Sequence, residues 1–250
     1  TRLGSIEDGP PVSDYEPEEQ HRQTSIQTSV LACTWRDHKV NVIDTPGYAD
    51  FRGEVVSAIQ VADGAVIVIA CPAGVEVGSS QMWRMVEDRG LPRLIFISKM
   101  DRENADFQRA MDSVVEVFGR KCVPIQIPIG AEAGFKGVIN LMDPASAVPT
   151  ELQDEVEESR ERLTEAIAES DDDLATKYLE GEVLTQDELI NGLKKGVASG
   201  DIVPVFVGSS PAEISSSQIL DGIVDLLPSP LETVPILASN SGIGEEVSLS

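Results

Sequence analysis

The stretch that decides the fold is Val40-Asn41-Val42-Ile43-Asp44-Thr45-Pro46-Gly47, in which an apolar run ends in an acid, a turn and a glycine. The same order recurs further along the chain in Arg93-Leu94-Ile95-Phe96-Ile97-Ser98-Lys99-Met100-Asp101. Short apolar runs of this kind predict buried strands, and each one ends in polar residues. In open α/β sheets ligands bind outside the carboxyl ends of the strands, so we expect a ligand site at that edge.

The polar residues after the two runs suit a nucleotide. Asp44 can hold a metal-bound water, and Gly47 lets a backbone N–H approach a phosphate closely. The second run resembles the Asn-Lys-x-Asp element of GTPases, and this resemblance implies that Asp101 accepts two hydrogen bonds from the guanine edge. Either element alone is unspecific, because an Asp after a strand is common. The two in this order predict guanine-nucleotide binding.

Strand-like and helix-like runs alternate along the first half of the chain. Residues 64–70 form a continuous apolar run, which predicts a central parallel strand covered on both faces. Residues 28–35 and 39–43 predict a pair of strands joined by a tight turn. Residues 1–23 are polar with several Gly and Pro, and they predict a mobile loop. Further expected elements are helices at 54–62, 79–87 (capped by Ser79 or Ser80) and 106–118, and a strand at 94–97. This rhythm predicts a parallel α/β sheet with right-handed crossovers.

After Gly119 the rhythm changes. Two short strands are expected, then an acidic, helix-rich segment over 151–198 that is too regular for a disordered tail. A solvated helix face explains most of these acids. The remaining expectations are short strands at 123–129 and 137–141, a buried strand with a polar loop at 204–210, a last helix at 219–227 and a linker at 239–250.

Composition and charge restrict the classes of partner. The chain has 250 residues with 41% hydrophobic and 25% charged residues, as in an ordinary globular protein. A net charge of −24 argues against direct nucleic-acid binding, because the overall electrostatic field of the protein repels the phosphate backbone. Three separated cysteines and the lack of a signal peptide favour reduced thiols in a cytoplasm. No apolar run approaches the ~20 residues needed to span a membrane, so no membrane partner is expected.

The order of motifs resembles the GTPase domain of translational GTPases, specifically the elongation factor G family or an elongation-factor-G-like paralogue. The resemblance covers about residues 14–236. The motifs that carry it are Glu19-Gln20-His21-Arg22-Gln23-Thr24-Ser25-Ile26, Asp44-Thr45-Pro46-Gly47-Tyr48-Ala49-Asp50-Phe51, Asp63-Gly64-Ala65, Gly74-Val75-Glu76, Lys99-Met100-Asp101, Pro124-Ile125-Gln126-Ile127-Pro128-Ile129-Gly130 and Leu226-Leu227-Pro228-Ser229-Pro230.

The resemblance implies a fold, a domain layout and a set of site residues. The fold is a P-loop GTPase-type mostly parallel sheet with helices on both faces and an inserted α+β subdomain. The layout is a GTPase domain over 1–119, the inserted acidic subdomain over 120–200, a return to the GTPase domain over 201–236 and a linker to a further domain over 237–250. The implied site residues are Tyr48 for catalysis, Ser25 and Asp44 for Mg²⁺, and Asp44, Gly47, Ser98, Lys99, Asp101, Gly208, Ser209 and Ser210 for GTP or GDP.

Several positions depart from the family pattern. The chain contains no Gly-x-x-x-x-Gly-Lys-Ser/Thr, and we expect this phosphate loop to lie before Thr1 in a longer protein. Tyr48 stands where elongation factor G has the His that orients the attacking water. A phenol with a pKa of about 10 is a poor base, so slow hydrolysis is expected. Ser98 replaces the usual Asn and can make only part of its contacts. Ser25 replaces a Thr but keeps the hydroxyl.

Other roles remain open for these residues. Asp44 could merely cap the next helix, and Asp101 could pair only with Lys99 or Arg102. Tyr48 could be a packing residue, and Lys99 a surface residue. The Gly208-Ser209-Ser210 loop, which stands where the family touches the guanine base, could be a plain turn.

The leading functional prediction is a monomeric, GTP-binding translation factor that couples GTP hydrolysis to ribosome translocation or a related ribosomal step. By family resemblance, its acidic subdomain would contact a ribosomal stalk protein. The alternative is a GTP-dependent ribosome-binding or regulatory module with little or no catalysis, and the residue at Tyr48 discriminates between the two. An ATPase of similar topology is disfavoured by the Lys-x-Asp element.

Overall fold

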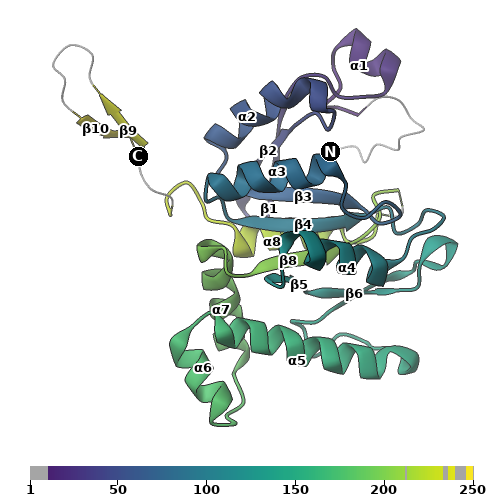
Figure 1. Ribbon diagram of the computed structural model, residues 1–250, viewed down its shortest axis with the longest axis vertical. Helices are drawn as coiled ribbons and strands as arrows, with labels where there is room; N and C mark the ends of the chain where they lie inside the picture. Colours follow the sequence, from purple (N-terminus) through teal and green to yellow (C-terminus); the bar gives the residue numbers. More distant parts are fainter. Residues whose placement is uncertain (1–10, 212, 233–235, 240–245, 250) are drawn as a thin grey trace.

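The computed structural model describes residues 11–211, 213–232, 236–239 and 246–249, and its centre is a parallel sheet (Figure 1). Four strands pair in the order β3-β4-β8-β5, and all three pairs are parallel. The strands are β3 (Ala65–Ala70), β4 (Arg93–Ser98), β5 (Cys122–Pro124) and β8 (Val203–Val207). Parallel pairing brings the carboxyl ends to one edge, so the predicted parallel α/β sheet is confirmed.

Helices cover both faces of this sheet. Because successive strand residues point to opposite faces, Ile95 and Ile97 pack into one buried cluster with residues of α3 (Val77–Asp88) and α4 (Phe107–Phe118). Leu94 belongs to the other cluster, which includes residues of α8 (Ser216–Leu226). Leu94, Ile95 and Ile97 are all fully buried, and burial of each such side chain contributes roughly 1.5–3 kcal/mol.

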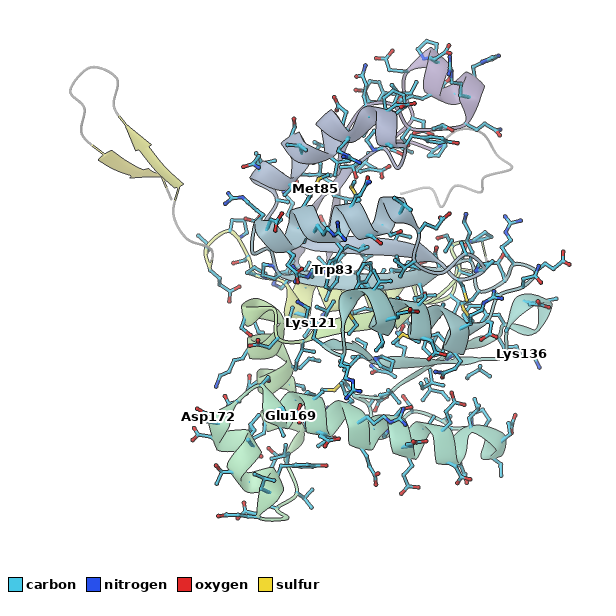
Figure 2. All side chains as sticks on the ribbon, viewed as in Figure 1. Trp83, Met85, Lys121, Lys136, Glu169 and Asp172 are labelled. Atoms are coloured by element: carbon cyan, nitrogen blue, oxygen red, sulfur yellow. The ribbon has the colours of Figure 1, made fainter. Side chains whose placement is uncertain are left out.

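The amino end of β4 is held by an aromatic and charged cluster, part of which is labelled in Figure 2. Trp83 stacks on Phe118 with ring centroids 4.2 Å apart. The Arg93 guanidinium lies 4.3 Å from the Trp83 ring, and Lys121 Nζ lies 5.2 Å from it. Arg93 and Lys121 both pair with Glu87, at 3.0 and 2.6 Å. This cluster lies at the end of the strand opposite to Ser98.

Strands β1 (Ser29–Trp35) and β2 (His38–Asp44) form a separate antiparallel pair, as predicted. Their turn uses Arg36 and Asp37, whose φ angles of 44° and 62° are both positive, as a two-residue hairpin turn of type I′ requires. The tip of this hairpin contacts α8, because Trp35 Nε1 donates to Asp221 at 2.9 Å. Arg36 also pairs with two acids of α8, and they raise its pKa.

The expectation that residues 64–70 form a central strand covered on both faces is wrong for β3. Within the described part of the chain β3 pairs only with β4, and β2 pairs only with β1. Val68 of β3 is 59% exposed, so the face of the strand that carries it is not fully covered, and Val42 of β2 is 39% exposed. A continuous apolar run indicates that a strand is suited to burial, but it does not report how many neighbours that strand has.

Three further expectations are corrected near the chain ends and in α3. Residues 1–10 lie outside the described residues, but residues 17–22 of the expected mobile loop form helix α1 (Pro17–Arg22), which Pro at the first helical position favours. Ser79 and Ser80 lie inside α3, whose N-cap position is Glu76, and the Glu76 side chain makes no capping hydrogen bond. The described residues of the expected linker over 237–250 form two antiparallel strands, β9 (Ile236–Ser239) and β10 (Glu246–Leu249). This pairing gives hydrogen-bond partners to backbone N–H and C=O groups that would bond only to water in an extended linker.

The segment expected as an inserted subdomain starts inside the main sheet, because β5 pairs with β8. Three helices of this segment lie together beneath the sheet (Figure 1). They pack closely, since a Cβ on Gly192 of α7 would lie 2.7 Å from Ile167 of α5 and from Leu174 of α6. The elements are β6 (Gln126–Ile129), β7 (Gly137–Asn140), α5 (Gln153–Glu169), α6 (Asp172–Leu179) and α7 (Gln186–Ser199).

The remaining elements complete the structure. They are α2 (Arg52–Val61) and the short 3-10 helices η2 (Ala49–Phe51), η3 (Glu132–Gly134) and η4 (Thr150–Leu152). None of the described helices combines the length and apolar character that a bilayer crossing requires.

Candidate functional site

The carboxyl ends of β4 and β8 bring two polar loops together. Ile97 and Val207 are partners in the parallel ladder, so the residues that follow them lie side by side. Gly208 N–H donates to the Ile97 carbonyl at 2.9 Å, and Met100 N–H donates to the Gly208 carbonyl at 3.3 Å. A Cβ on Gly208 would lie 2.5 Å from the Ile214 carbonyl oxygen, so only glycine permits this close approach.

Asp101 and Ser209 join the two loops directly. The Ser209 hydroxyl donates to Asp101 Oδ1 at 2.6 Å, and Ser209 is fully buried. A hydrogen bond to a carboxylate is short and strong, and it fixes the orientation of the acid. Arg102 Nε lies 3.8 Å from the other carboxylate oxygen. The Asp101 side chain is 24% exposed, so the oriented carboxylate still reaches the surface.

Ser98, Lys99 and Ser210 lie on the same two loops. The Ser98 hydroxyl donates to the Ile69 carbonyl at 3.2 Å, and Ser98 is nearly buried at 9% exposure. Lys99 is exposed and has a positive φ of 62°. Ser210 is exposed. The structure therefore brings six of the predicted residues into what we call the base cluster, namely Ser98, Lys99, Asp101, Gly208, Ser209 and Ser210.

Ser25 and Asp44 lie at one end of the β1–β2 hairpin. Asp44 faces Ser29 across the ladder, and Ser25 lies in the irregular segment that leads into β1 at Ser29. The Ser25 hydroxyl donates to Asp14 Oδ1 at 2.8 Å, which leaves its oxygen lone pairs available. Asp44 does not cap the next helix, because α2 begins after Phe51.

Gly47 and Tyr48 follow Asp44 in an open segment. Tyr48 precedes η2 and is 62% exposed. A Cβ on Gly47 would meet nothing within 4 Å, so packing inside the chain does not require glycine there. We call Ser25, Asp44, Gly47 and Tyr48 together the switch cluster, a set defined by their predicted place on the phosphate side and not by contacts among them. Its hairpin shares no ladder with the main sheet in the described residues.

The donors of the switch cluster fit Mg²⁺ chemically. A serine hydroxyl and a carboxylate are hard oxygen ligands, and Mg²⁺ is typically bound by one or two carboxylates plus phosphate oxygens. The described residues contain no group of three or more His, Cys, Asp or Glu that could hold a metal by themselves. Any Mg²⁺ here would complete its shell with oxygen ligands from water or from a nucleotide.

Sequence reasoning missed three residues that support these clusters. Gln126 is 1% exposed and contacts the loop after β8. Its signal was a polar residue inside the apolar run Ile125-Gln126-Ile127. Glu132 contacts the loop after β4, and its neighbours gave no comparable signal. Glu19 is fully buried and accepts hydrogen bonds from the N–H groups of Ile26 and Gln27, at 2.8 and 2.9 Å.

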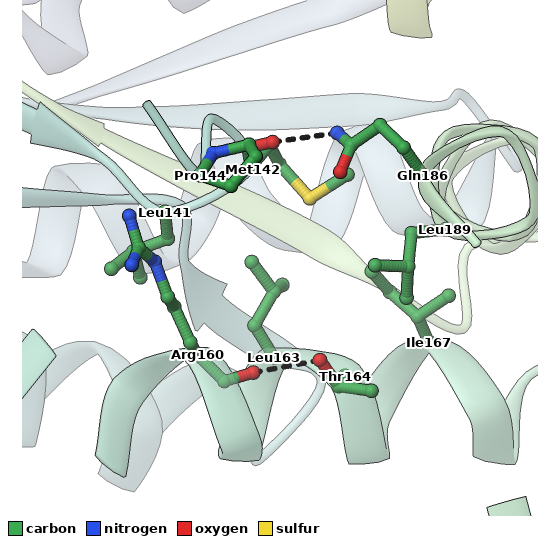
Figure 3. Close-up of a pocket in the computed structure, with 9 residues that line it drawn as sticks. All are labelled: Leu141, Met142, Pro144, Arg160, Leu163, Thr164, Ile167, Gln186 and Leu189. Carbon is green, nitrogen blue, oxygen red and sulfur yellow. Dashed lines mark hydrogen bonds between the residues drawn. The ribbon is translucent and has the colours of Figure 1, made fainter. Parts of the chain in front are cut away.

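A cavity of about 150 Å³ lies elsewhere, between α5, α7 and the segment after β7 (Figure 3). Arg160 Nε is buried there and has no partner among the described residues, while another guanidinium nitrogen donates to the Asp143 carbonyl at 2.9 Å. The lining residues are Leu141, Met142, Pro144, Arg160, Leu163, Thr164, Ile167, Gln186 and Leu189. The cavity shares no residue with either cluster.

A parallel sheet with helices on both faces and polar loops at its carboxyl edge defines an α/β domain that binds ligands at that edge, as P-loop GTPase domains do. The chain belongs to the family of the elongation factor Tu GTP binding domain, which residues 4–229 match. It is accordingly a GTP-binding domain of a translational GTPase of the elongation factor G and Tu type.

A crystal structure of a protein from Thermus thermophilus is similar to this chain, with a TM-score of 0.86 and 33% sequence identity. The match covers 95% of this chain and 38% of that protein's chain. The chain thus spans well under half the length of this relative.

Proposed function

We propose that this chain is the nucleotide-binding part of an elongation-factor-G-like translation factor, a monomer in the cytoplasm that hydrolyses GTP slowly on the ribosome. The observation that carries this proposal is the base cluster, in which Ser209 fixes a partly exposed carboxylate at Asp101. In the domain layout that we propose, residues 1–119 and 201–236 bind the nucleotide, 120–200 form the inserted subdomain and 237–250 lead to a further domain.

Asp101 supplies the specificity for guanine. Its carboxylate accepts hydrogen bonds from the N1–H and the 2-amino group of guanine, whereas adenine offers neither donor at that edge. Lys99 lays its aliphatic stem over the plane of the base, and Ser98 and residues 208–210 complete the pocket. Each charge-assisted hydrogen bond is worth roughly 1.5–3 kcal/mol.

The switch cluster serves the phosphates. Ser25 and Asp44 would hold Mg²⁺, directly or through water, and the ion would supply positive charge beside the phosphates. Gly47 presents its backbone N–H to the terminal phosphate. Tyr48 positions the attacking water, and its neutral phenol is a weaker base than an imidazole, so the reaction is slow.

The acidic helices are the proposed contact with the ribosome. Every acid on α5 is exposed, while the apolar side of the same helix, with Val156, Leu163 and Ile167, is buried. A solvated anionic face of this kind suits a partner with complementary charge. We propose a ribosomal stalk protein as that partner. The exposed acids of α5 are Asp154, Glu155, Glu157, Glu158, Glu161, Glu165 and Glu169.

Nucleotide titrations of the full-length natural protein test the proposal. We expect GTP and GDP to bind at least roughly tenfold more tightly than ATP and ADP, because adenine leaves the Asp101 carboxylate unpaired. Equal affinities would contradict it. If the protein binds GTP tightly and stays on the ribosome in the presence of GTP but does not hydrolyse it, the result would instead support a non-catalytic ribosome-binding module.

A further inference from the structure

Gln126 holds both ends of the loop that carries Ser209. Its side chain is 1% exposed. Oε1 accepts hydrogen bonds from the Val207 N–H at 3.0 Å and from the Ser215 hydroxyl at 2.9 Å. Val207 ends β8, and Ser215 precedes α8, so one buried oxygen fixes the start and the finish of the loop.

The loop between these two ends is closed on itself. Ser209 N–H donates to the Ile214 carbonyl and Ile214 N–H donates to the Ser209 carbonyl, both at 3.1 Å. Ser215 has a φ of 70°, a strained conformation for a residue with a side chain. The hydrogen bond to Gln126 helps to hold that conformation, and the closed loop transmits it to Ser209 and from there to Asp101.

Glu132 holds the other loop in the same way. Its N–H donates to the Met100 carbonyl at 2.8 Å, and its carboxylate accepts from the Asn104 N–H at 2.7 Å. These two contacts bracket Asp101. The turn that brings Glu132 there depends on Gly130, which has a φ of 78° and where a Cβ would lie 2.2 Å from the Gly134 carbonyl oxygen.

We propose that residues 126–132 are the positioning element of the base cluster, with Gln126 fixing the Ser209 loop and Glu132 fixing the Asp101 loop. The inference rests on the proposed function, in which Asp101 binds guanine. Neither residue touches the base. Both hold the Asp101 carboxylate in the orientation that meets N1–H and the 2-amino group, so they act on base selectivity more than on phosphate binding.

The test compares GDP with inosine diphosphate, which lacks only the 2-amino group, in the full-length protein. Gln126→Met keeps the side-chain length but removes the acceptor, and Gln126→Glu keeps an acceptor oxygen. We expect wild type to prefer GDP by roughly tenfold or more, as for one charge-assisted hydrogen bond. Gln126→Met should reduce that ratio to about threefold or less, and Gln126→Glu should restore most of it.

Glu132→Ala and Glu132→Gln provide an independent pair, because the glutamine amide can still accept from the Asn104 N–H. We expect the alanine variant to lower the ratio and the glutamine variant to keep it. An unchanged GDP-to-inosine-diphosphate ratio in both Gln126→Met and Glu132→Ala would overturn the inference, even if both nucleotides bound more weakly. A wild type without preference between the two nucleotides would instead overturn the proposed role of Asp101 itself.

Discussion

The base cluster and the switch cluster differ in how much of their geometry the chain itself fixes. Ser209 is fully buried and bonded to Asp101, and both loops are tied to the sheet. In the switch cluster, by contrast, Tyr48 is 62% exposed, and the hairpin is outside the main sheet in the described residues. We infer that base recognition is preorganised by internal hydrogen bonds, whereas the phosphate side takes its catalytic geometry from the nucleotide and its partners.

The largest expected effect concerns residues 1–250 as an isolated protein. They lack the Gly-x-x-x-x-Gly-Lys-Ser/Thr loop whose N–H groups and Lys cradle phosphates, and the base cluster cannot replace those contacts. We expect GDP binding at least about 10²-fold weaker than in the full-length protein, since two or more charge-assisted hydrogen bonds are missing. Calorimetric titration of both forms measures this. Micromolar binding by residues 1–250 would show that the base cluster suffices.

Tyr48→His tests the switch cluster alone. An imidazole can hydrogen-bond the attacking water and accept its proton more readily than a neutral phenol, and such groups contribute typically ~10²–10⁴-fold. We expect ribosome-stimulated single-turnover hydrolysis to rise at least about tenfold, with GDP affinity unchanged. Tyr178→His on α6 is the matched control. An unchanged or lower rate would mean that Tyr48 does not limit the reaction.

Ser209→Ala tests how the base cluster holds the Asp101 carboxylate. Loss of the hydroxyl frees the Asp101 carboxylate to rotate, and one charge-assisted hydrogen bond disappears. We expect GDP affinity to fall roughly threefold to tenfold, with little effect on the hydrolysis rate at saturating GTP. Ser217→Ala, on the exposed start of α8, is the control. A fall in rate without a fall in affinity would place Ser209 on the phosphate side.

The smallest effect is a pH dependence of the switch segment. Hydrogen bonds from the N–H groups of Gln27 and Ile26 lower the pKa of Glu19. A lowered pKa means that this contribution to stability is present above the unfolded value of about 4.3 and is lost as the pH falls through the folded value. We expect the Ile26 and Gln27 amides to lose hydrogen-exchange protection at acid pH before the β4 amides do. Equal loss in both places would contradict this expectation.

Much of the fold could be predicted from the sequence, because strand and helix periodicities are local. The residues of the β1–β2 hairpin, the helices on both sheet faces and the edge that carries Asp101 follow from runs and turns. The edge position of β3 could not be predicted, since an apolar run does not reveal which strands pair with it. Helix α1 was missed because its helix-favouring residues lie in a polar stretch rich in Gly and Pro.

The candidate site was predictable as a set of residues but not as an arrangement. The order of motifs marked Asp101 and the loop at 208–210, yet the hydrogen bond between Ser209 and Asp101 joins positions far apart in the sequence. The contacts of Gln126 and Glu132 depend on how β6 and its turn pack against β8 and the β4 loop. Such long-range polar contacts leave no periodic signal in the chain.

The measurement that tests the central claim most directly is the base specificity of Asp101→Asn in the full-length protein. Asparagine replaces an acceptor oxygen by an N–H donor, which suits the 2-carbonyl of xanthine and not the 2-amino group of guanine. We predict that GDP affinity falls roughly tenfold to a hundredfold and that xanthosine diphosphate affinity rises. The control Glu103→Gln, which removes an exposed charge from the same loop, should change neither. Unaltered GDP binding in Asp101→Asn would contradict the account, because the fixed carboxylate would then not be what reads the base.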